Sequence, residues 1–573
     1  MQIFATILSV LGFGFLFLAA GRGILSFIFR DYKAFPASMK YGLGYFLGMA
    51  GFLAAWRLLE SIFSSSAVAF WLSSVFMIFL SAYFIWKRGL GIERPNYRKI
   101  FFASLLFIFV LAFEFALWLQ VLPTPRDPFD NFGSAHPVRY ANIAEYIFRA
   151  GDIPVLNQNF AQSLLAAIPR FFGAAVPFLA LNLWLGISIF TLIIAVYGLF
   201  QHWGLKKGSA AFATFLFMMA NTALSFTHVL SLDSNNPFLM SSYTDATAGI
   251  ATFFVFLLVL LALIKSEFSS WKNWFFIPAV FGVYWSFSGG QNIILAAALL
   301  IVLCAWHLYR HKNFKNSIFV FAATFGVFSL LGSSQGGMLT PKLFRDRISL
   351  PGLAGVNREG EYSGIKPELP FAVGLSRNWE YGNPYDPAEK EVYVQVIKGK
   401  TAISASMLHR MIWRLESNAW VAVRVAFFPL LGLVMFGLFK KFFTQDLQRL
   451  WNFAIWIFAT GFAFAFGIII SGRKWEMSRF MILPYALGLM FFILWISFIR
   501  QKINSSLRAR ILEIFVALVM TVGPIVNAAV IIYDNFKNPS LDEKKISFFF
   551  QNPGIYGREV WQEWIEKGLV KEE

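Results

Sequence analysis

The feature that most constrains this chain is a series of long, uninterrupted apolar runs that recurs over most of its length. A run of about 20 apolar residues folded as an α-helix matches the thickness of the hydrocarbon core of a bilayer. The runs are continuous rather than alternating, so they lack the pattern of a membrane β-barrel. We therefore expect an all-α polytopic membrane protein with about 14 transmembrane helices. The expected spans are residues 3–29, 41–62, 67–86, 99–122, 174–200, 209–230, 247–265, 274–288, 291–309, 316–333, 419–439, 450–471, 477–499 and 511–533.

Composition supports this class. Of the 573 residues 58% are hydrophobic and 14% are charged, whereas a soluble domain has roughly 25% charged residues. The net charge of +18 resides mostly in short loops between apolar runs, which excludes nucleic acid as the expected partner. The single cysteine, Cys304, lies in an apolar run and predicts neither a disulfide framework nor a thiol metal site. The first run is too long for a signal-peptide core, and we interpret it as a retained span.

Positive charge alternates from loop to loop, as expected for a multi-pass protein of the plasma (inner) membrane. The short loops at 61–66, 231–246 and 286–292 contain no Lys or Arg and are expected on the outer, periplasmic face. The same alternation places residues 123–173 outside. The expected organisation is additional N-terminal helices at 1–90, a catalytic transmembrane module at 91–333 with the outer loop 123–173, an outer insert at 334–418, C-terminal helices at 419–533 and an outer tail at 534–573.

The first large outer loop carries the most suggestive polar residues. Its stretch "PRDPFDNFGSAHP", residues 125–137, contains Asp127, Asp130 and His136. The following stretch, "PVRYANIAEYIFRAGDIP", separates an apolar face from a polar one on a helical wheel and predicts a helix lying in the membrane interface. A second juxtamembrane segment, "NFAQSLLAAIPRFFG", precedes the next span.

This order of elements resembles the first outer loop of the GT-C superfamily of membrane glycosyltransferases. The resemblance implies a polyprenyl-phosphate-linked sugar donor, a glycan, lipid or protein acceptor, and a loop carboxylate that acts as base or orients the acceptor. It favours Asp130 as that carboxylate, with Asp127 second and His136 beside them. Here three additional spans precede the span that ends in the loop, which departs from the family pattern. The alternative is that both aspartates cap turns and that His136 bonds to backbone at a helix start.

A late outer loop, "SGRKWEMSRF", is basic where the other short outer loops are not. Arg473, Lys474 and Arg479 are candidates for binding the donor phosphate, because Arg suits bidentate phosphate contact. The pair formed by Arg479 and Phe480 also resembles the Arg-aromatic pair of GT-C proteins. The alternative is that these side chains snorkel to general lipid headgroups.

Other outer segments supply secondary candidates. Asp233 and Asp245 lie in the second acidic loop, and together with Asp130 they are the ligands expected if a divalent cation takes part. The alternative for this loop is a simple turn. Candidates for acceptor or sugar contacts are Trp285, Gln291, Asn292, His409 and Arg410.

Two other functions are compatible with the sequence. A transporter or flippase for lipid-linked glycans is expected to place polar groups at the bilayer midplane. An O-antigen-ligase-like enzyme would use the outer insert with His409 and Arg410. Within the spans, Arg57 and Glu114 lie at similar expected depth, and we predict a structural contact between them because isolated charges in lipid usually pair.

Overall fold

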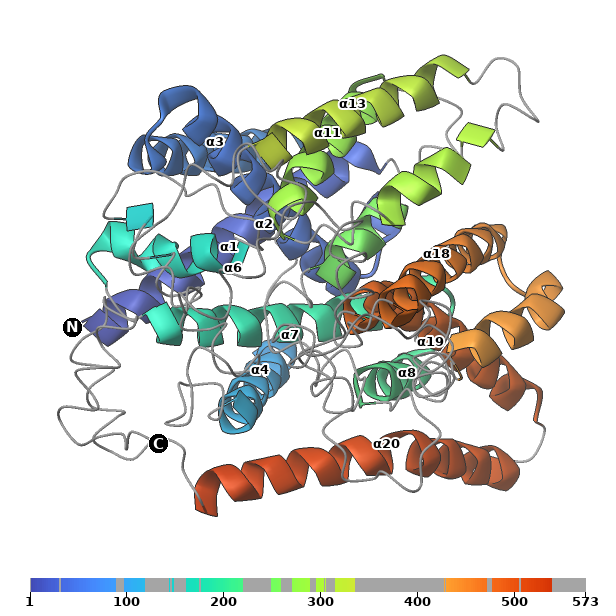
Figure 1. Ribbon diagram of the computed structural model, residues 1–573. Helices are drawn as coiled ribbons and strands as arrows, with labels where there is room; N and C mark the ends of the chain where they lie inside the picture. Colours follow the sequence, from blue (N-terminus) through green and yellow to red (C-terminus); the bar gives the residue numbers. More distant parts are fainter. Residues whose placement is uncertain are drawn as a thin grey trace, which may run out of the picture.

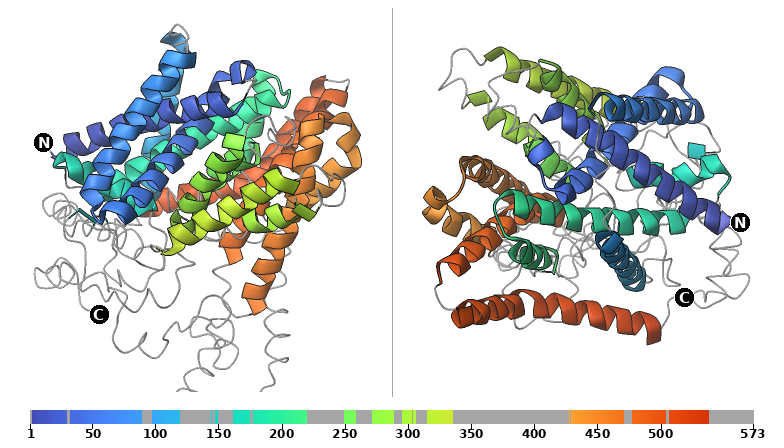
Figure 2. Two further views of the ribbon diagram at one scale, coloured as in Figure 1. Left: turned by 90° about the horizontal axis from the view of Figure 1, so that it is seen from above. Right: turned by 180° about the vertical axis from the view of Figure 1, so that it is seen from behind.

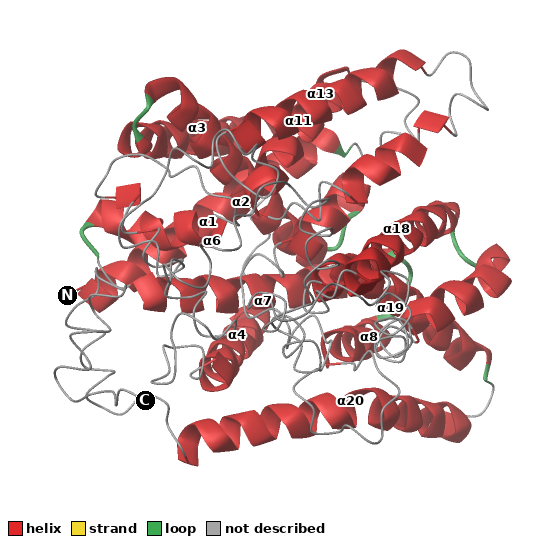
Figure 3. Cartoon of the chain, viewed as in Figure 1, coloured by secondary structure: helices red, strands yellow, loops and turns green. Residues whose placement is uncertain are grey.

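The computed structural model describes the helical part of the chain. The described residues are 2–29, 32–88, 97–118, 144, 147–148, 161–174, 177–219, 249–258, 271–288, 295–302, 304–305, 315–334, 427, 429–470, 477–503 and 506–537. All the secondary-structure elements in this part are helices, as the sequence predicts (Figure 3).

The N-terminal half begins with long helices joined by short turns. Its elements are α1 (Gln2–Ile28), η1 (Tyr32–Ala34), α2 (Ala37–Phe63), α3 (Ser66–Arg88), α4 (Tyr97–Trp118), α6 (Ala161–Ala167), η3 (Ile168–Phe172), α7 (Pro177–His202) and α8 (Lys207–Met219). The later elements are α11 (Trp271–Ser288), α13 (Lys315–Ser334), η5 (Lys440–Phe442), α18 (Gln445–Ile470), α19 (Met477–Lys502) and α20 (Ser506–Lys537). Further helical residues are Gly249–Leu258, 295–302 and 429–439.

Among the described helices, six are long and apolar enough to cross a membrane. They are Ile3–Ile28, Ala37–Phe63, Ser66–Lys87, Leu179–His202, Leu483–Arg500 and Leu507–Val526. Shorter apolar helices lie at Ile100–Glu114, Lys207–Met219, Gly249–Leu258, Phe275–Ser288 and Phe319–Gly332. Many large side chains on these helices are exposed, for example Phe15 at 69% and Phe79 at 70%, which is the surface that lipid covers in a membrane protein. The chain is therefore an α-helical membrane protein.

Helix α2 lies between α1 and α7 at the centre of the N-terminal half (Figure 1). Glycine residues allow α2 to pack closely against both α1 and α7. A side chain at Gly48 would overlap the carbonyl oxygen of Phe17 in α1, and a side chain at Gly198 in α7 would overlap the backbone of Met39. Such small-residue contacts replace the hydrophobic effect as the basis of helix association in a bilayer.

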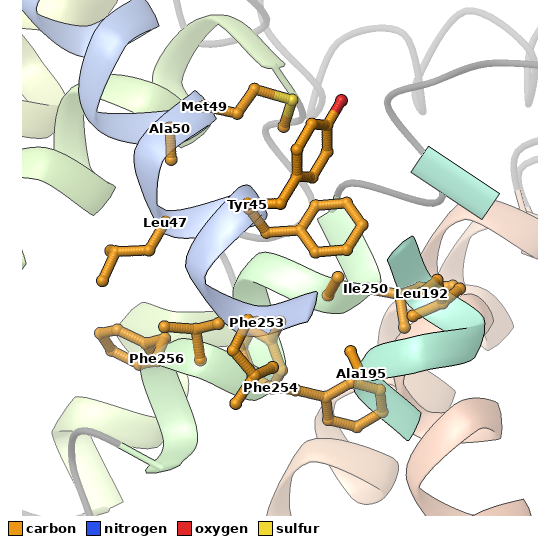
Figure 4. Packing of buried hydrophobic residues seen from close by; sticks show 14 of the residues in the cluster. Tyr45, Leu47, Met49, Ala50, Leu192, Ala195, Ile250, Phe253, Phe254 and Phe256 are labelled. Atoms are coloured by element: carbon orange, nitrogen blue, oxygen red, sulfur yellow. The ribbon is translucent and has the colours of Figure 1, made fainter. Parts of the chain in front are cut away.

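The core continues from α2 into α7 and the helix Gly249–Leu258 (Figure 4). Tyr45 and Leu47 of α2 and Leu192 of α7 are buried there, together with Phe253 and Phe256. Most of these side chains are aromatic or branched and carry no charge. The core of this half is thus built from three separate parts of the sequence.

The C-terminal half packs in the same manner. Trp451 of α18 donates its indole N–H to the carbonyl of Leu433 at 2.7 Å, and Gly432 lies against the backbone of Gly488 in α19. Helix α20 runs along one side of the molecule in Figure 1 and in the right-hand view of Figure 2. Arg500 joins α19 to both neighbours, because it pairs with Glu513 of α20 at 2.7 Å and donates a hydrogen bond to Ser209 of α8.

Candidate functional site

The candidate catalytic loop is bounded by α4 before it and by the juxtamembrane helices after it. Asp127, Asp130 and His136 lie outside the described residues. Ala144 and Ile147 are helical and fully buried, and both belong to the apolar face that the helical wheel predicts. The second juxtamembrane segment is described from Ala161 onward, as α6 and η3. Its packing shows which helices anchor the chain directly after the loop.

Helix α6 is buried along its whole length, including Gln162 and Ser163. Trp184 of α7 donates its indole N–H to the carbonyl of Leu165 at 2.8 Å, which ties α6 to the following span. A buried short helix needs such partners because backbone groups at its ends are otherwise unpaired. Segment α6 is therefore part of the packed structure.

The turn from η3 into α7 depends on one glycine. Gly173 has a φ of 74°, in the left-handed region that glycine adopts without strain. Its N–H bonds to the carbonyl of Arg170 at 3.0 Å, and the N–H of Ala174 bonds to the carbonyl of Pro169 at 3.1 Å. These two hydrogen bonds cap the end of η3, which stops at Phe172, shortly before α7 begins at Pro177.

Aromatic rings dock η3 onto the N-terminal helices. Phe171 stacks on Phe70 of α3 with ring centroids 4.2 Å apart and an interplanar angle of 12°. Its neighbour Phe172 meets Phe13 of α1 and Trp71 of α3 edge-on, at 5.7 and 5.4 Å. Offset stacked and edge-on rings are the favoured arrangements of aromatic pairs. Helices α1 and α3 therefore form the surface on which the juxtamembrane segment lies.

The same segment also reaches the first juxtamembrane helix. Phe148 meets Phe171 edge-on at 5.6 Å, and the guanidinium carbon of Arg170 lies 4.6 Å from the centre of the Phe148 ring. A continuous set of contacts thus joins Phe70 to Phe148, the latter twelve residues after His136 in the sequence. The sequence analysis did not single out Arg170. The available signal was an arginine that directly precedes two aromatic residues, Phe171 and Phe172, in the second juxtamembrane segment.

A buried ion pair lies near the end of α2. Arg57 and Glu60 are 3.2 Å apart, one helical turn from each other, and both are almost inaccessible. Trp56 beside them donates its indole N–H to the carbonyl of Ser66 at 3.1 Å. Glu114 is buried in α4, and its contact with Arg57 stays a prediction.

The remaining candidates are mostly outside the described residues. These are Arg473, Lys474, Asp233, Asp245, Gln291, Asn292, His409 and Arg410. Arg479 is placed in the first turn of α19, which begins at Met477, so it belongs to a helix start rather than to a loop. Nothing is described of its side chain.

Trp285 is the one predicted sugar-contact residue whose side chain is described. It is fully buried in α11, with ring contacts to Phe256 at 5.0 Å and Phe281 at 4.9 Å. Its indole N–H donates to the hydroxyl of Thr252 at 3.3 Å. This packing accounts for Trp285 as a core residue, and a sugar contact by this side chain stays a prediction.

The described residues contain no group of three or more His, Cys, Asp or Glu side chains that could hold a metal ion. Asp130, Asp233 and Asp245 are outside that part of the chain. No family model, curated protein or solved structure matches this chain.

Proposed function

We propose that this protein is a GT-C-like membrane glycosyltransferase that moves a sugar from a polyprenyl-phosphate-linked donor to a glycan, lipid or protein acceptor. The reaction takes place at the outer face of the plasma (inner) membrane. One observation carries the proposal: an acidic loop is followed by juxtamembrane helices that pack onto the membrane helices. Buried Ala144 and Ile147, α6 and η3 support this arrangement. A loop anchored in this way suits chemistry on a lipid-linked substrate at the membrane surface.

The proposed chemistry assigns each group a role. Asp130 accepts the proton of the acceptor hydroxyl, whose oxygen then bonds to the anomeric carbon of the donor sugar. The bond from that carbon to the phosphate oxygen breaks, and the polyprenyl phosphate leaves with the electron pair. Arg479, with Arg473 and Lys474, stabilises the negative charge on the phosphate. Direct displacement inverts the anomeric centre, as the resemblance implies.

The other candidates have supporting roles in the proposal. Asp127 is the second choice for the base, and His136 follows Asp130 by six residues in the sequence. Asp233 and Asp245 face the donor or a divalent cation. The insert 334–418, with His409 and Arg410, recognises the acceptor or covers the site. The proposed topology has about 14 spans, in which the shorter apolar helices also cross the membrane.

A transporter of lipid-linked glycans is the second candidate function. The buried Arg57–Glu60 pair favours it, because charged groups within spans often mark a transport pathway. Both residues, however, lie in the last third of the 27-residue helix α2, which ends at Phe63. This position suits a structural pair better than a midplane site.

Asp130→Asn tests the proposed function. We expect kcat for transfer to fall by about 10²- to 10⁴-fold, the usual contribution of a positioned general base. The measurement is release of polyprenyl phosphate by the purified protein, offered a panel of synthetic polyprenyl-phosphate hexoses and pentoses with membrane extract as acceptor. Asp127→Asn is the companion variant, which removes an equal charge from the same loop, and a larger fall of kcat there than in Asp130→Asn would exchange the roles of the two aspartates.

Two outcomes would contradict the proposed function. Full transfer by Asp130→Asn would remove Asp130 from the role of base. Movement of labelled donor across vesicles by the wild-type protein, with no release of polyprenyl phosphate, would favour the transporter instead.

A further inference from the structure

A cluster of cationic and tyrosine side chains lies at the other end of the N-terminal helices. It comprises Arg22 of α1, Tyr32 and Lys33 of η1, and Lys40 and Tyr41 of α2. Arg22 follows Phe13, which contacts η3, by nine residues along α1, or about 14 Å at 1.5 Å per residue. The cluster is therefore separate from the candidate catalytic loop.

The guanidinium of Arg22 is held in place from three directions. Its Nε donates a hydrogen bond to the hydroxyl of Tyr32 at 3.2 Å, and its central carbon lies 4.4 Å from the centre of the Tyr41 ring. Its aliphatic stem lies directly on α2, because a Cβ at Gly44 would be 2.9 Å from the Cγ of Arg22. A cation fixed in this way has little conformational entropy left to lose when it binds an anion.

None of these contacts neutralises the charge. Tyr32 is buried, and burial raises its pKa above the usual value despite the opposing effect of Arg22, so its hydroxyl is neutral at physiological pH. The Nη hydrogens of Arg22 make no hydrogen bond to another described residue. Arginine therefore keeps the two donor groups that bind an oxyanion in bidentate fashion.

A second cation reinforces the first. The ammonium of Lys40 lies 5.2 Å from the centre of the Tyr32 ring and donates a hydrogen bond to the carbonyl of Lys33 at 3.1 Å. Between Ala20 and Tyr41 the sequence has four basic residues and one acid, Asp31. This excess of positive charge favours an anionic ligand.

We infer that the cluster around Arg22 binds the phosphate of an anionic membrane phospholipid. Arg22 supplies bidentate hydrogen bonds to the phosphate oxygens, and Lys40 adds a nearby positive charge. Tyr32 and Lys33 lie between the apolar spans Ile3–Ile28 and Ala37–Phe63, and Arg22 lies six residues before the end of the first span. A long arginine side chain at such a position can reach the level of the lipid headgroups. That position favours a lipid over a soluble phosphate compound.

Native mass spectrometry of the full-length protein in detergent tests this site. Dioleoyl-phosphatidylglycerol is titrated against wild type, Arg22→Gln and Lys87→Gln. Lys87 is the matched control, because it is exposed at the end of α3 and also contacts a tyrosine, donating to the hydroxyl of Tyr83 at 2.8 Å. We expect Arg22→Gln to weaken the first binding event about tenfold, a typical effect for a hydrogen bond to a charged group, and Lys87→Gln to leave it unchanged.

A conservative variant and further ligands identify what binds and distinguish a lost contact from a misfolded protein. Arg22→Lys retains the charge without the bidentate geometry, so binding between that of wild type and Arg22→Gln is expected. Dioleoylglycerol, which lacks the phosphate, should bind equally to all variants. Equal loss in Arg22→Gln and Lys87→Gln, or unchanged binding in Arg22→Gln, would refute the site. Displacement of the lipid by inorganic phosphate alone would overturn the assignment to a phospholipid.

Discussion

At the scale of single residues, glycines decide how closely the N-terminal helices approach. Gly21 of α1 faces the backbone of Gly44 in α2, and Gly48 faces the backbone of Phe17. In both cases the neighbouring atom is a carbonyl oxygen rather than the end of a flexible side chain. A methyl group at either position therefore requires the helices to move apart.

Gly48→Ala is expected to destabilise the protein by about 1–3 kcal/mol, the usual cost of overpacking. The measurement is the thermal unfolding midpoint in detergent. Gly12→Ala is the matched control, because it lies in α1 and has no neighbouring atom within 4 Å of a built Cβ. Replacement at Gly12 should leave the midpoint unchanged or raise it slightly, since alanine favours helix. Equal midpoints for both variants would contradict the close approach of α1 and α2.

The phenylalanines of α1 show what the sequence cannot predict at this scale. Phe15 is 69% exposed, whereas Phe17, two residues later, is fully buried against Trp184 of α7 with ring centroids 5.5 Å apart. Both stand in one apolar run, so hydropathy does not distinguish the lipid-facing side from the protein-facing side. Arg57 is a similar case, because its described ion pair with Glu60, one turn away in the same helix, was not predicted, while its contact with Glu114 stays a prediction.

At the scale of elements, η3 connects the candidate catalytic loop to the N-terminal helix α3. It follows the candidate loop in the chain, and it docks on α3 through Phe171 and Phe70. The first juxtamembrane helix contacts the same ring through Phe148. Phe171 is therefore the aromatic residue that both segments after the loop contact, while Phe172 adds contacts of η3 to Phe13 and Trp71.

Phe171→Ala is expected to lower transfer activity more than it lowers stability. The lost stacking is worth about 0.5–1.5 kcal/mol beyond buried area, a modest loss for a protein of this size. Displacement of the loop by about 1 Å can lower kcat about 100-fold. Phe76→Ala is the control, because Phe76 is 49% exposed on the same helix α3 as Phe70.

Comparison of kcat with the unfolding midpoint shows why Phe171→Ala loses activity. A fall in kcat with an unchanged unfolding midpoint would support a positioning role for Phe171. A parallel fall of activity and midpoint in both variants would indicate general destabilisation.

Helices were the most predictable elements of this chain. The span expected at 41–62 is the helix Ala37–Phe63, and the one expected at 477–499 is Met477–Lys502. Continuous apolar runs determine such elements locally, because a backbone in lipid must satisfy its own hydrogen bonds. The turn at Gly173 and the docking of η3 depend on distant partners, so they could not be predicted. Asp130 and its loop lie outside the described residues and stay a prediction.

At the scale of the whole molecule, the helices before residue 90 form part of the core. Helix α2 contacts α7 through Gly42 and Ala195, and Trp184 of α7 stacks on Phe17 of α1. Helices α1 and α3 also hold η3. The sequence analysis named residues 1–90 as an addition to the catalytic module, whereas these contacts give them a supporting role within the fold.

Expression of the chain as two fragments, residues 1–90 and 91–573, tests this role. We expect the larger fragment alone to be unstable in detergent, because removal of α1–α3 uncovers buried faces of α7 and η3. Coexpression should restore a complex that copurifies through a tag on either fragment, since small-residue contacts between spans do not require a covalent link. Size-exclusion chromatography and the unfolding midpoint provide the measurements. A fragment 91–573 with the midpoint of the intact chain would mean that the N-terminal helices are a separable appendage. Copurification of both fragments, with the larger one aggregating alone, would instead mean that α1–α3 are needed to hold the helices next to the candidate site in position.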